Sequence, residues 1–288
     1  MGKTQGWTMK KRNNTIAIAV PASMVAEIKD LREKTSVLGQ LGRAAAIYRV
    51  DQIIIYRDEP DESMTMKYIL GYLETPQYLR KERFDVRPEL QYVGILPPLR
   101  TPHHPTEDRL SEVDVGDFRD GVVVGGSGFN YEVDIGLDKL ITVRGKPPAK
   151  GTRVTVEIMD TEPEFSGRSV KNKNVPYYWG YDLRGSNRLL SELVYSPEWD
   201  MTIATSKKGD EFSSVMNDME SKWVEAGKTL IVFGSYKEGV IEMIASEGRK
   251  AREVFDYIIN TIPDQGVETV RTEEAVISTL AILNIFND

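Results

Sequence analysis

Cysteine is absent from the sequence, and its absence removes several kinds of chemistry together. A disulfide framework, a zinc–thiolate site and a thiol nucleophile each require cysteine side chains. None of these can contribute to the stability or activity of this chain. A protein without thiols suits a reducing compartment, so we expect it in the cytoplasm.

Histidine is almost absent: His103 and His104, in the segment TPHHP, are the only two. A metal site would need further ligands at suitable spacing, and the sequence places none beside them, so we predict no metal. Two interpretations of the pair stay open. A histidine here can act as a general base, but an exposed pair in a proline-rich linker is more often only solvated.

An excess of basic residues and long apolar runs are also missing. The net charge of −7 excludes a globally basic nucleic-acid binder, so any RNA or DNA partner must meet a local cationic patch. Two segments supply such charge, Arg80–Arg87 (RKERFDVR) and Gly167–Asn174 (GRSVKNKN), although each also suits a solvated surface. The apolar runs fall short of the roughly 20 residues that span a bilayer, so we predict no membrane association.

The first 96 residues alternate short apolar strands with amphipathic helices. We predict buried strands at Thr15–Val20 and Gln52–Tyr56, because both are short and rich in β-branched residues. Apolar residues at helical spacing predict helices over about 24–31, 38–48 and 66–73. Strands that are apolar on both faces favour a parallel sheet covered by helices on both sides.

The composition changes near Pro97. From Asp117 to about Val175 the helical period disappears, and short strands alternate with turns rich in glycine, proline and aspartate. The glycines of Gly125–Gly128 fit one such hairpin turn. A stretch of this size suits a small antiparallel barrel of the OB type, a fold often used on oligonucleotides. We predict a discontinuous α/β domain over 1–96 and 176–288, with an inserted RNA-binding OB-like barrel over 97–175.

The α/β pattern returns after residue 175, with helices predicted at 178–194, 212–223 and 238–252 and strands at 200–205, 229–234 and 255–259. Three connections leave apolar strands and carry glycine: ATSKKGDEF, VFGSYKEGV and NTIPDQGVETVRTEE. Ligands of open α/β sheets bind at this carboxyl edge. A glycine in one such turn is ordinary, but three together, the last so long and polar, favour a ligand site.

The last predicted helix begins near Arg271. Thr272 suits its N-cap, and Glu273 and Glu274 suit the positive end of its dipole. The residues that follow are apolar almost all round, so the helix must be buried on several sides. Packing across a subunit interface achieves this, and we expect a homodimer through this helix.

The segment NTIPDQGVETVRTEEAVISTLAILN (260–284), with IVFGSYKEG before it, resembles the trefoil-knotted SPOUT methyltransferases. The closer likeness is to their archaeal and eukaryotic branch of RNA methyltransferases, which carries an OB-like insertion. LGQLGRAAAIYRVDQIIIY, GILPPLRTPHH and TIATSKKG also look like that branch's segments in its order, so the likeness covers most of the chain. It implies a knotted Rossmann-like α/β sheet and a homodimer.

The resemblance also implies that S-adenosyl-L-methionine is bound in the knot by the three connections. By match, the cofactor-binding residues are Thr205, Gly209, Phe233, Gly234, Ser235, Gly239, Asn260, Ile262, Gln265, Gly266 and Thr269.

The implied reaction is methyl transfer to RNA, either rRNA or tRNA. Without cysteine, the covalent thiolate route to a pyrimidine C5 is excluded, which leaves a ring nitrogen or a ribose 2′-hydroxyl as acceptor. Arg43 and Arg271 are candidates for orienting the acceptor or stabilising its developing charge. A surface helix arginine and a salt bridge to a neighbouring glutamate are the alternative interpretations. The predicted RNA contacts are Arg168, Lys171, Lys173, His103 and His104.

Two other function classes stay open at this stage. The chain can be a non-catalytic RNA-binding or ribosome-assembly factor that keeps the knotted fold, although the intact loops favour an enzyme. A nucleotide-dependent oxidoreductase is remote, because no G-x-G-x-x-G follows the first strand.

Overall fold

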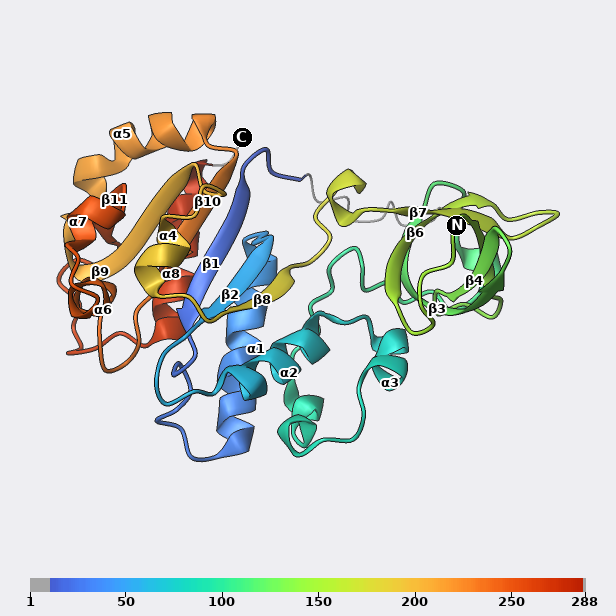
Figure 1. The fold of residues 1–288 in the computed structure, drawn as a ribbon, viewed down its shortest axis with the longest axis horizontal. Coiled ribbons are helices and arrows are strands. Elements are labelled where there is room, and N and C mark those ends of the chain that lie inside the picture. Colours follow the sequence, from blue (N-terminus) through green and yellow to red (C-terminus); the bar gives the residue numbers. More distant parts are fainter. Residues whose placement is uncertain (1–10, 287–288) are drawn as a thin grey trace. The chain divides into compact units, whose positions relative to one another are not determined.

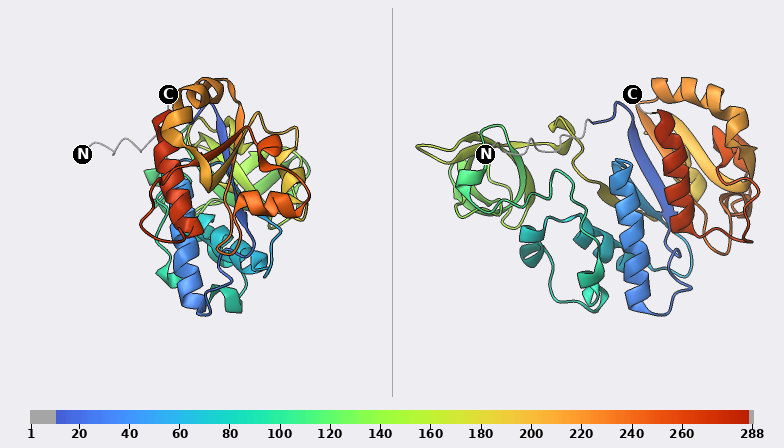
Figure 2. Two further views of the ribbon diagram at one scale, coloured as in Figure 1. Left: turned by 90° about the vertical axis from the view of Figure 1, so that its left-hand side faces the viewer. Right: turned by 180° about the vertical axis from the view of Figure 1, so that it is seen from behind.

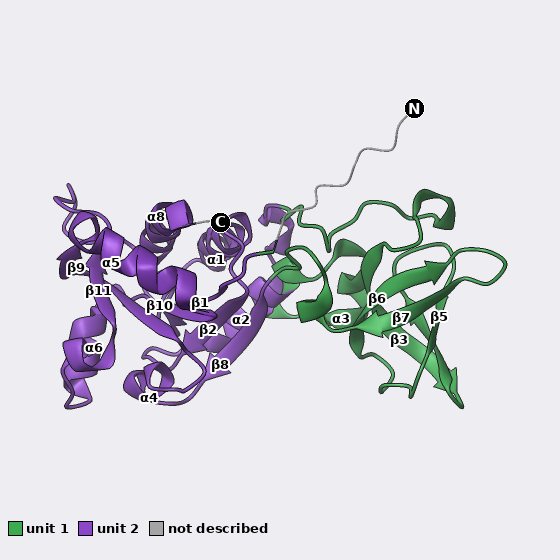
Figure 3. Ribbon diagram, turned by 90° about the horizontal axis from the view of Figure 1, so that it is seen from above, with its two compact units in different colours: residues 1–11, 72–88, 98–180 green, residues 12–71, 89–97, 181–288 purple. Residues whose placement is uncertain are grey.

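A computed structural model describes residues 11–286 of the protein. Residues 1–10, which open the predicted 1–96 segment, and residues 287–288 lie outside the described part. The described chain divides into two compact units, coloured separately in Figure 3. We call residues 12–71, 89–97 and 181–286 the sheet unit. The barrel unit comprises residues 72–88 and 98–180, together with Lys11.

A six-stranded sheet organises the sheet unit (Figure 1). Its spatial order is β11 (Tyr257–Asn260), β9 (Met201–Glu211), β10 (Lys228–Val232), β1 (Thr15–Pro21), β2 (Gln52–Tyr56) and β8 (Asp182–Ser186). Every neighbouring pair runs parallel, so the carboxyl ends of all strands meet at one edge. The parallel α/β sheet expected from the apolar strands is confirmed.

Helices cover both faces of this sheet (Figures 2 and 3). On one face α1 and α8 lie side by side, and α4 and α6 cover the other. The helices of the unit are α1 (Leu31–Ile47), α2 (Ser63–Glu74), α4 (Leu190–Val194), α5 (Phe212–Glu225), α6 (Val240–Ser246), α7 (Ala251–Val254) and α8 (Thr272–Leu283). Burial on both faces explains why β1, β2 and β10 are apolar at almost all positions after their first residues.

Three helix predictions need correction. Residues 22–27 form turns, and α1 begins only at Leu31, where the Asp30 carboxylate accepts the amide of Arg32 at 2.6 Å. The segment predicted as a helix over 178–194 contains β8 and only the short α4. The predicted helix over 238–252 is divided into α6 and α7 at Gly248, whose φ is 75°.

The barrel unit contains a closed barrel with the strand order β3–β4–β5–β7–β6. Its strands are β3 (Phe118–Ser127), β4 (Asn130–Asp134), β5 (Ile141–Arg144), β6 (Arg153–Asp160) and β7 (Ser166–Val170). The pairings are antiparallel except β5 with β7. Inward-facing residues such as Val133, Val143 and Val156 form its core. The prediction of a turn at Gly125–Gly128 is correct only for its last residue. Gly125–Ser127 pair with β4 as the end of β3, and the turn that closes the β3–β4 hairpin consists of Gly128 and Phe129.

The remaining regular elements are short. They are α3 (Arg80–Arg83) and single 3-10 turns at Gln77–Leu79, Pro88–Leu90, Val93–Ile95, Leu110–Glu112, Asn172–Asn174 and Asn284–Phe286. Within residues 11–286, no helix combines the length and apolar character needed to cross a membrane.

A buried polar cluster joins the barrel to the segment 72–88 within the barrel unit. The Arg153 guanidinium donates to both carboxylate oxygens of Glu74, at 2.5 and 2.9 Å, and to Asp120. Asp120 also accepts the indole N–H of Trp179 at 2.9 Å. Two carboxylates share one guanidinium here. Burial opposes ionisation of Glu74, but the Arg153 charge and the hydrogen bonds to this carboxylate hold its pKa at about 2.

Both histidines belong to this cluster. His103 is fully buried, and the Nε2 atoms of His103 and His104 lie 3.0 and 2.7 Å from the Glu74 carbonyl oxygen, which accepts a hydrogen bond from each. Burial is the largest cause that lowers the pKa of His104 to about 3. His104 is therefore neutral at neutral pH and serves the packing of the barrel unit.

The neutral His104 makes the stability of the barrel unit depend on pH. Between pH 6.5 and 3 the unfolded chain binds a proton at this residue that the folded chain does not. The free energy of unfolding therefore falls as the pH drops through that window, by about 1.4 kcal/mol per pH unit from this single group. We expect His104→Gln, whose amide can still donate to the carbonyl, to flatten the profile. Urea unfolding at pH 7 and pH 5.5 measures this, and parallel profiles for the two proteins would contradict it.

Candidate functional site

A cavity of about 370 Å³ opens at the carboxyl edge of the parallel sheet, beside the ends of β10 and β11 and a loop within β9. Its walls come from that loop, from the connections that follow β10 and β11, and from the start of α8. The lining residues are 205–208, 233–239, 242, 259–262, 265, 268–270, 272 and 275. The sequence predicts that the three connections together form a ligand site, and the cavity that they line is large enough for a small ligand.

The first wall is a loop within β9. Ile258 of β11 pairs with Ala204, but the next residue, Ile259, pairs with Asp210, so the residues between leave the ladder. Gly209 closes this loop, and a Cβ there would stand 2.6 Å from the Ile259 backbone. The predicted connection between a strand and a helix is therefore an excursion within one strand, whose small glycine allows two backbones to approach.

The second wall is the loop 233–239 after β10. Its first residue is held from two sides, because the Phe233 amide donates to the Ala19 carbonyl and the Tyr56 hydroxyl donates to the Phe233 carbonyl at 2.7 Å. The loop then closes on itself, since the Ser235 amide donates to the Glu238 carbonyl at 2.9 Å. Gly234 has no room for a side chain: a Cβ would lie 3.0 Å from the Glu238 carbonyl oxygen. The wall is thus a backbone surface of fixed shape.

The third wall runs from β11 to α8. The Asn260 side chain accepts the Ile262 amide at 2.9 Å and donates to the Lys207 carbonyl at 3.3 Å, which ties this wall to the first. Further along, the Gln265 amide donates to the carbonyls of Val267 and Glu268. Polar side chains therefore support this long connection from within, as the surplus of polar residues in NTIPDQGVET predicts.

The first turn of α8 completes the cavity. The Thr272 hydroxyl donates to the Gly234 carbonyl at 3.0 Å and so joins the third wall to the second. Thr272 is not the N-cap that we predicted: Arg271 holds that position, and its amide donates to the Glu274 carboxylate at 2.9 Å. The neighbouring Glu273 is buried, which is the main cause that raises its pKa.

Most of the predicted cofactor residues line this cavity. They are Thr205, Phe233, Gly234, Ser235, Gly239, Asn260, Ile262, Gln265 and Thr269. Gly209 and Gly266 are not among the lining residues; Gly209 serves the close approach of β9 to β11, and the space around Gly266 is open. Sequence reasoning missed other lining residues, including Lys207, Lys208, Glu242 and Ala275. Lys207 and Lys208 belong to the connection ATSKKGDEF, and that membership could have identified them; Glu242 and Ala275 lie in the first turns of α6 and α8, where the sequence carries no such signal.

The two predicted catalytic arginines do not line the cavity in the single chain. Arg271 is exposed and follows Val270, which does line it. Arg43 is half-buried on α1, the helix beside α8. Their predicted roles stay predictions.

The predicted RNA contacts lie in the barrel unit and divide into two groups. Arg168, Lys171 and Lys173 are exposed on and just after β7, and Arg168 forms a 2.7 Å ion pair with Glu157. His103, by contrast, is completely buried, which leaves its ring no surface to offer RNA. The interpretation of the histidines as a solvated exposed pair is wrong for the same reason.

Comparison with known proteins decides the family. Residues 15–283 match the model of a family described as "Putative RNA methyltransferase". The chain belongs to this RNA methyltransferase family.

An uncharacterised protein of Halobacterium salinarum is 32% identical over 94% of this chain and 99% of its own length. The 28S rRNA (uridine-N(3))-methyltransferase of Homo sapiens is 31% identical over 94% of this chain and 78% of its own length. The protein of the same name from Drosophila melanogaster is 30% identical over 95% of this chain and 62% of its own length. The RNA methyltransferase activity expected from the resemblance is confirmed by this membership.

Proposed function

We propose that this RNA methyltransferase transfers the methyl group of S-adenosyl-L-methionine to a ring nitrogen of uridine in a structured rRNA. The observation that carries the proposal is the cavity at the carboxyl ends of β9, β10 and β11, whose walls are the three connections matched to the cofactor loops. Relatives from two animals are named for uridine N3 in 28S rRNA, which favours a base nitrogen over a ribose hydroxyl.

The residues of the cavity fit this cofactor. The closely packed Gly234 and the neighbouring loop backbone suit an adenine ring that is recognised by main-chain groups. Asn260, Gln265 and Thr269 add polar side chains for the ribose and the amino acid part. When bound, the cofactor supplies an electrophilic sulfonium methyl group.

The task left to the protein is to orient the acceptor and ease loss of its proton. A uridine N3 must lose a proton before its lone pair can attack, and a nearby cation stabilises the resulting negative charge. We assign this role to Arg271, which starts α8 next to the cavity wall, and to Arg43. This mechanism needs no thiolate nucleophile, in keeping with a chain that lacks cysteine.

Three structural expectations belong to the same proposal. The third wall of the cavity contacts the other two through the hydrogen bonds from Asn260 to Lys207 and from Thr272 to Gly234, and we propose that this part of the chain is threaded through its own loop as a trefoil knot, as in the SPOUT class. The barrel order β3–β4–β5–β7–β6 supports an OB-like domain. We propose that this domain, inserted over 97–175, holds the RNA, and that the enzyme acts in the cytoplasm.

We also propose that the active enzyme is a homodimer through α8. An apolar face of this helix remains uncovered in the single chain: Ile277 is 38% exposed, and Ile285, just after the helix, is 57% exposed. On α1, the helix beside α8, Ile47 is likewise exposed. Exposed apolar residues on two adjacent helices suit a self-complementary interface.

A charge on that surface should separate the subunits. We expect Ile277→Glu to lower the mass in solution to the 32.5 kDa of one chain, because burying an unpaired carboxylate opposes association. Sedimentation equilibrium measures the mass. Val224→Glu, which alters a 70% exposed apolar residue on α5, is the matched control and should leave the dimer intact. Equal masses for the two variants would contradict this interface.

Calorimetric titration with S-adenosyl-L-methionine, with NAD as the control ligand, tests the proposed function. Binding near one site per chain, followed by transfer of a radioactive methyl group to N3 of uridine in rRNA, would support it. RNA binding by a folded dimer without cofactor binding, either alone or with RNA present, would instead favour a non-catalytic RNA-binding factor.

A further inference from the structure

The turn between β3 and β4 presents an aromatic ring to solvent. Phe129 is 66% exposed, although burial of a phenylalanine in a core would be favourable. The amide of Gly145 donates to the Phe129 carbonyl at 2.9 Å, so the end of β5 passes directly beside the turn. A Cβ built at Gly125 or at Gly128 would meet no atom within 4 Å, so the surface of the hairpin beside these glycines is open. A ring that is mostly exposed and carried by a hydrogen-bonded backbone is available to a flat ligand.

The register of three strands places cations beside this ring. Asn130 of β4 pairs with Arg144 of β5, and Val143 pairs with Gly167 of β7 in parallel. The residues that follow the last pair, Arg144 and Arg168, therefore lie next to each other on neighbouring strands, which are about 4.8 Å apart. Both are exposed, because Val143 and Gly167 occupy the inward-facing positions. Arg144 therefore lies on the outer surface of the barrel at the same end of the β4–β5 ladder as the turn that carries Phe129, since Asn130 follows Phe129 and Gly145 follows Arg144.

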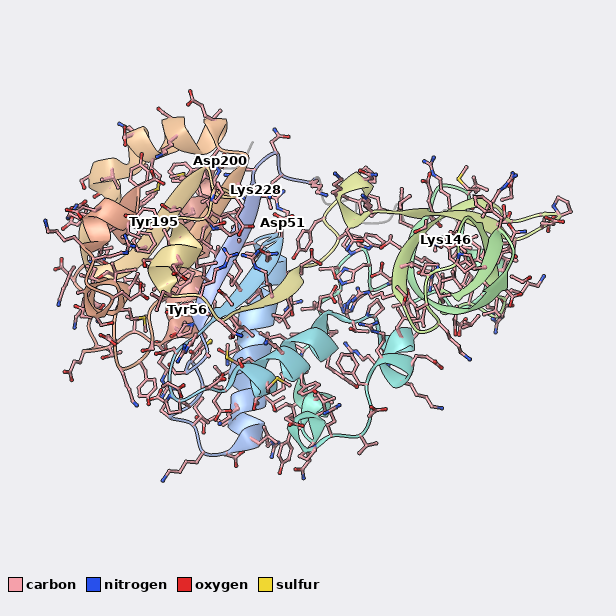
Figure 4. All side chains as sticks on the ribbon, in the orientation of Figure 1. Asp51, Tyr56, Lys146, Tyr195, Asp200 and Lys228 are labelled. Atoms are coloured by element: carbon pink, nitrogen blue, oxygen red, sulfur yellow. The ribbon has the colours of Figure 1, made fainter. Side chains whose placement is uncertain are left out.

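The charge of this surface is largely uncompensated. Lys146, which Figure 4 labels, is exposed and follows β5. Neither Lys146 nor Arg144 forms an ion pair within residues 11–286. Arg168 is partly neutralised by Glu157. Glu132 is the exposed acidic residue of β4, and no ion pair joins it to Arg144 in the described chain. An aromatic ring beside free cations is the combination that binds an unpaired base and its phosphates.

We propose that Phe129, Arg144, Lys146 and Arg168 form a binding track for a single-stranded stretch of RNA. An unpaired base stacks on Phe129, and the cations contact the phosphates that flank it. Duplex RNA does not suit this track, because its bases are already stacked and its sequence-bearing edges lie in a deep groove. The inference rests on the proposed function, since it specifies how the barrel unit holds the RNA substrate.

Fluorescence anisotropy of the full chain with a short labelled oligouridylate tests the track. We expect Phe129→Ala to weaken binding about tenfold, the effect of losing one stacked base, and Phe129→Trp to retain it. Met159→Ala, which truncates another exposed apolar side chain of the barrel, is the matched control and should bind as the unaltered protein does. Arg144→Gln should weaken binding and reduce the slope of log affinity against log salt by about 0.7, the value for one lost phosphate contact of a single strand.

The outcomes separate this inference from the proposed function. Equal affinity of Phe129→Ala and the unaltered protein would overturn the track, as would a preference for duplex over single strand or a lack of RNA binding by the unaltered protein. Calorimetry with S-adenosyl-L-methionine should give the same affinity for Phe129→Ala as for the unaltered protein. If the unaltered protein does not bind S-adenosyl-L-methionine but Phe129→Ala still weakens RNA binding, the proposed reaction is wrong and the binding track is supported.

Discussion

Replacing Gly234 with valine is expected to weaken binding of S-adenosyl-L-methionine by up to about a hundredfold. The loop 233–239 is closed so tightly that a Cβ at this position would meet three backbone atoms, of Glu238, Gly239 and Val240, at 3.0–3.1 Å. Backbone cannot rotate away as a side-chain end can, so the loop must open and the second wall of the cavity must move. Overpacking of this kind costs about 1–3 kcal/mol, which corresponds to a loss of affinity of up to about a hundredfold.

A second glycine substitution provides the control for this experiment. A Cβ at Gly266 meets no atom within 4 Å, so Gly266→Ala should bind the cofactor as the unaltered protein does. Calorimetry gives the two affinities, and circular dichroism shows whether each variant folds. If Gly234→Val fails to fold, Thr272→Val tests the same wall by removing the hydrogen bond to the Gly234 carbonyl. Full affinity in folded Gly234→Val would show that the cofactor does not use this cavity.

Replacing Arg153 with methionine is expected to lower the free energy of unfolding of the barrel unit by about 3–5 kcal/mol. The variant keeps the length and apolar stem of the side chain but removes the charge that Glu74 and Asp120 share. Both carboxylates are withdrawn from water, and Asp120 is 1% exposed. Without the guanidinium they are buried without a cation, or they must take up protons at neutral pH. Urea unfolding followed by circular dichroism measures the loss.

The exposed arginine of β7 gives the matched comparison. Arg168→Met removes an ion pair of similar length, to Glu157, but that arginine is 63% exposed and its charge remains hydrated. Exposed pairs contribute about 0–1 kcal/mol, so this variant should be close to neutral in stability. A similar loss in both variants would mean that burial does not strengthen the Arg153 cluster. The same Arg168→Met variant should still weaken RNA binding, because its cation belongs to the proposed track.

Strands with a strong apolar pattern were predictable, and the strand without one was not. β1 and β2 lie where the β-branched runs placed them, since both faces of a central parallel strand must be apolar. β8 has the sequence DLRGS and is only partly buried at the sheet edge. Its pairing with β2 supplies the backbone hydrogen bonds that make it a strand. Its side chains show no apolar strand pattern that would indicate this pairing, so the segment was predicted as part of a helix.

The buried polar cluster shows the same limit for charged residues. Glu74, Arg153 and His103 are far apart in the sequence, and each type is usually found at the surface. Only folding brings them together, and only their mutual hydrogen bonds make their burial tolerable. An expectation based on one residue at a time assigns them to solvent, as it did for His103.

Within the candidate site, the sequence by itself determined which connections form the cavity, because glycine and polar residues after apolar strands mark the ligand edge of a parallel sheet. The tertiary structure decided which residues of those connections line it. Gly209 and Gly266 were predicted to bind the cofactor but do not line the cavity. Tyr56 of β2, which was not predicted, donates the hydrogen bond that holds the Phe233 carbonyl. Local sequence sets where a chain turns, through backbone freedom and side-chain polarity. Which surfaces then meet depends on contacts between segments far apart in the sequence, and these contacts exist only once the whole sheet has formed.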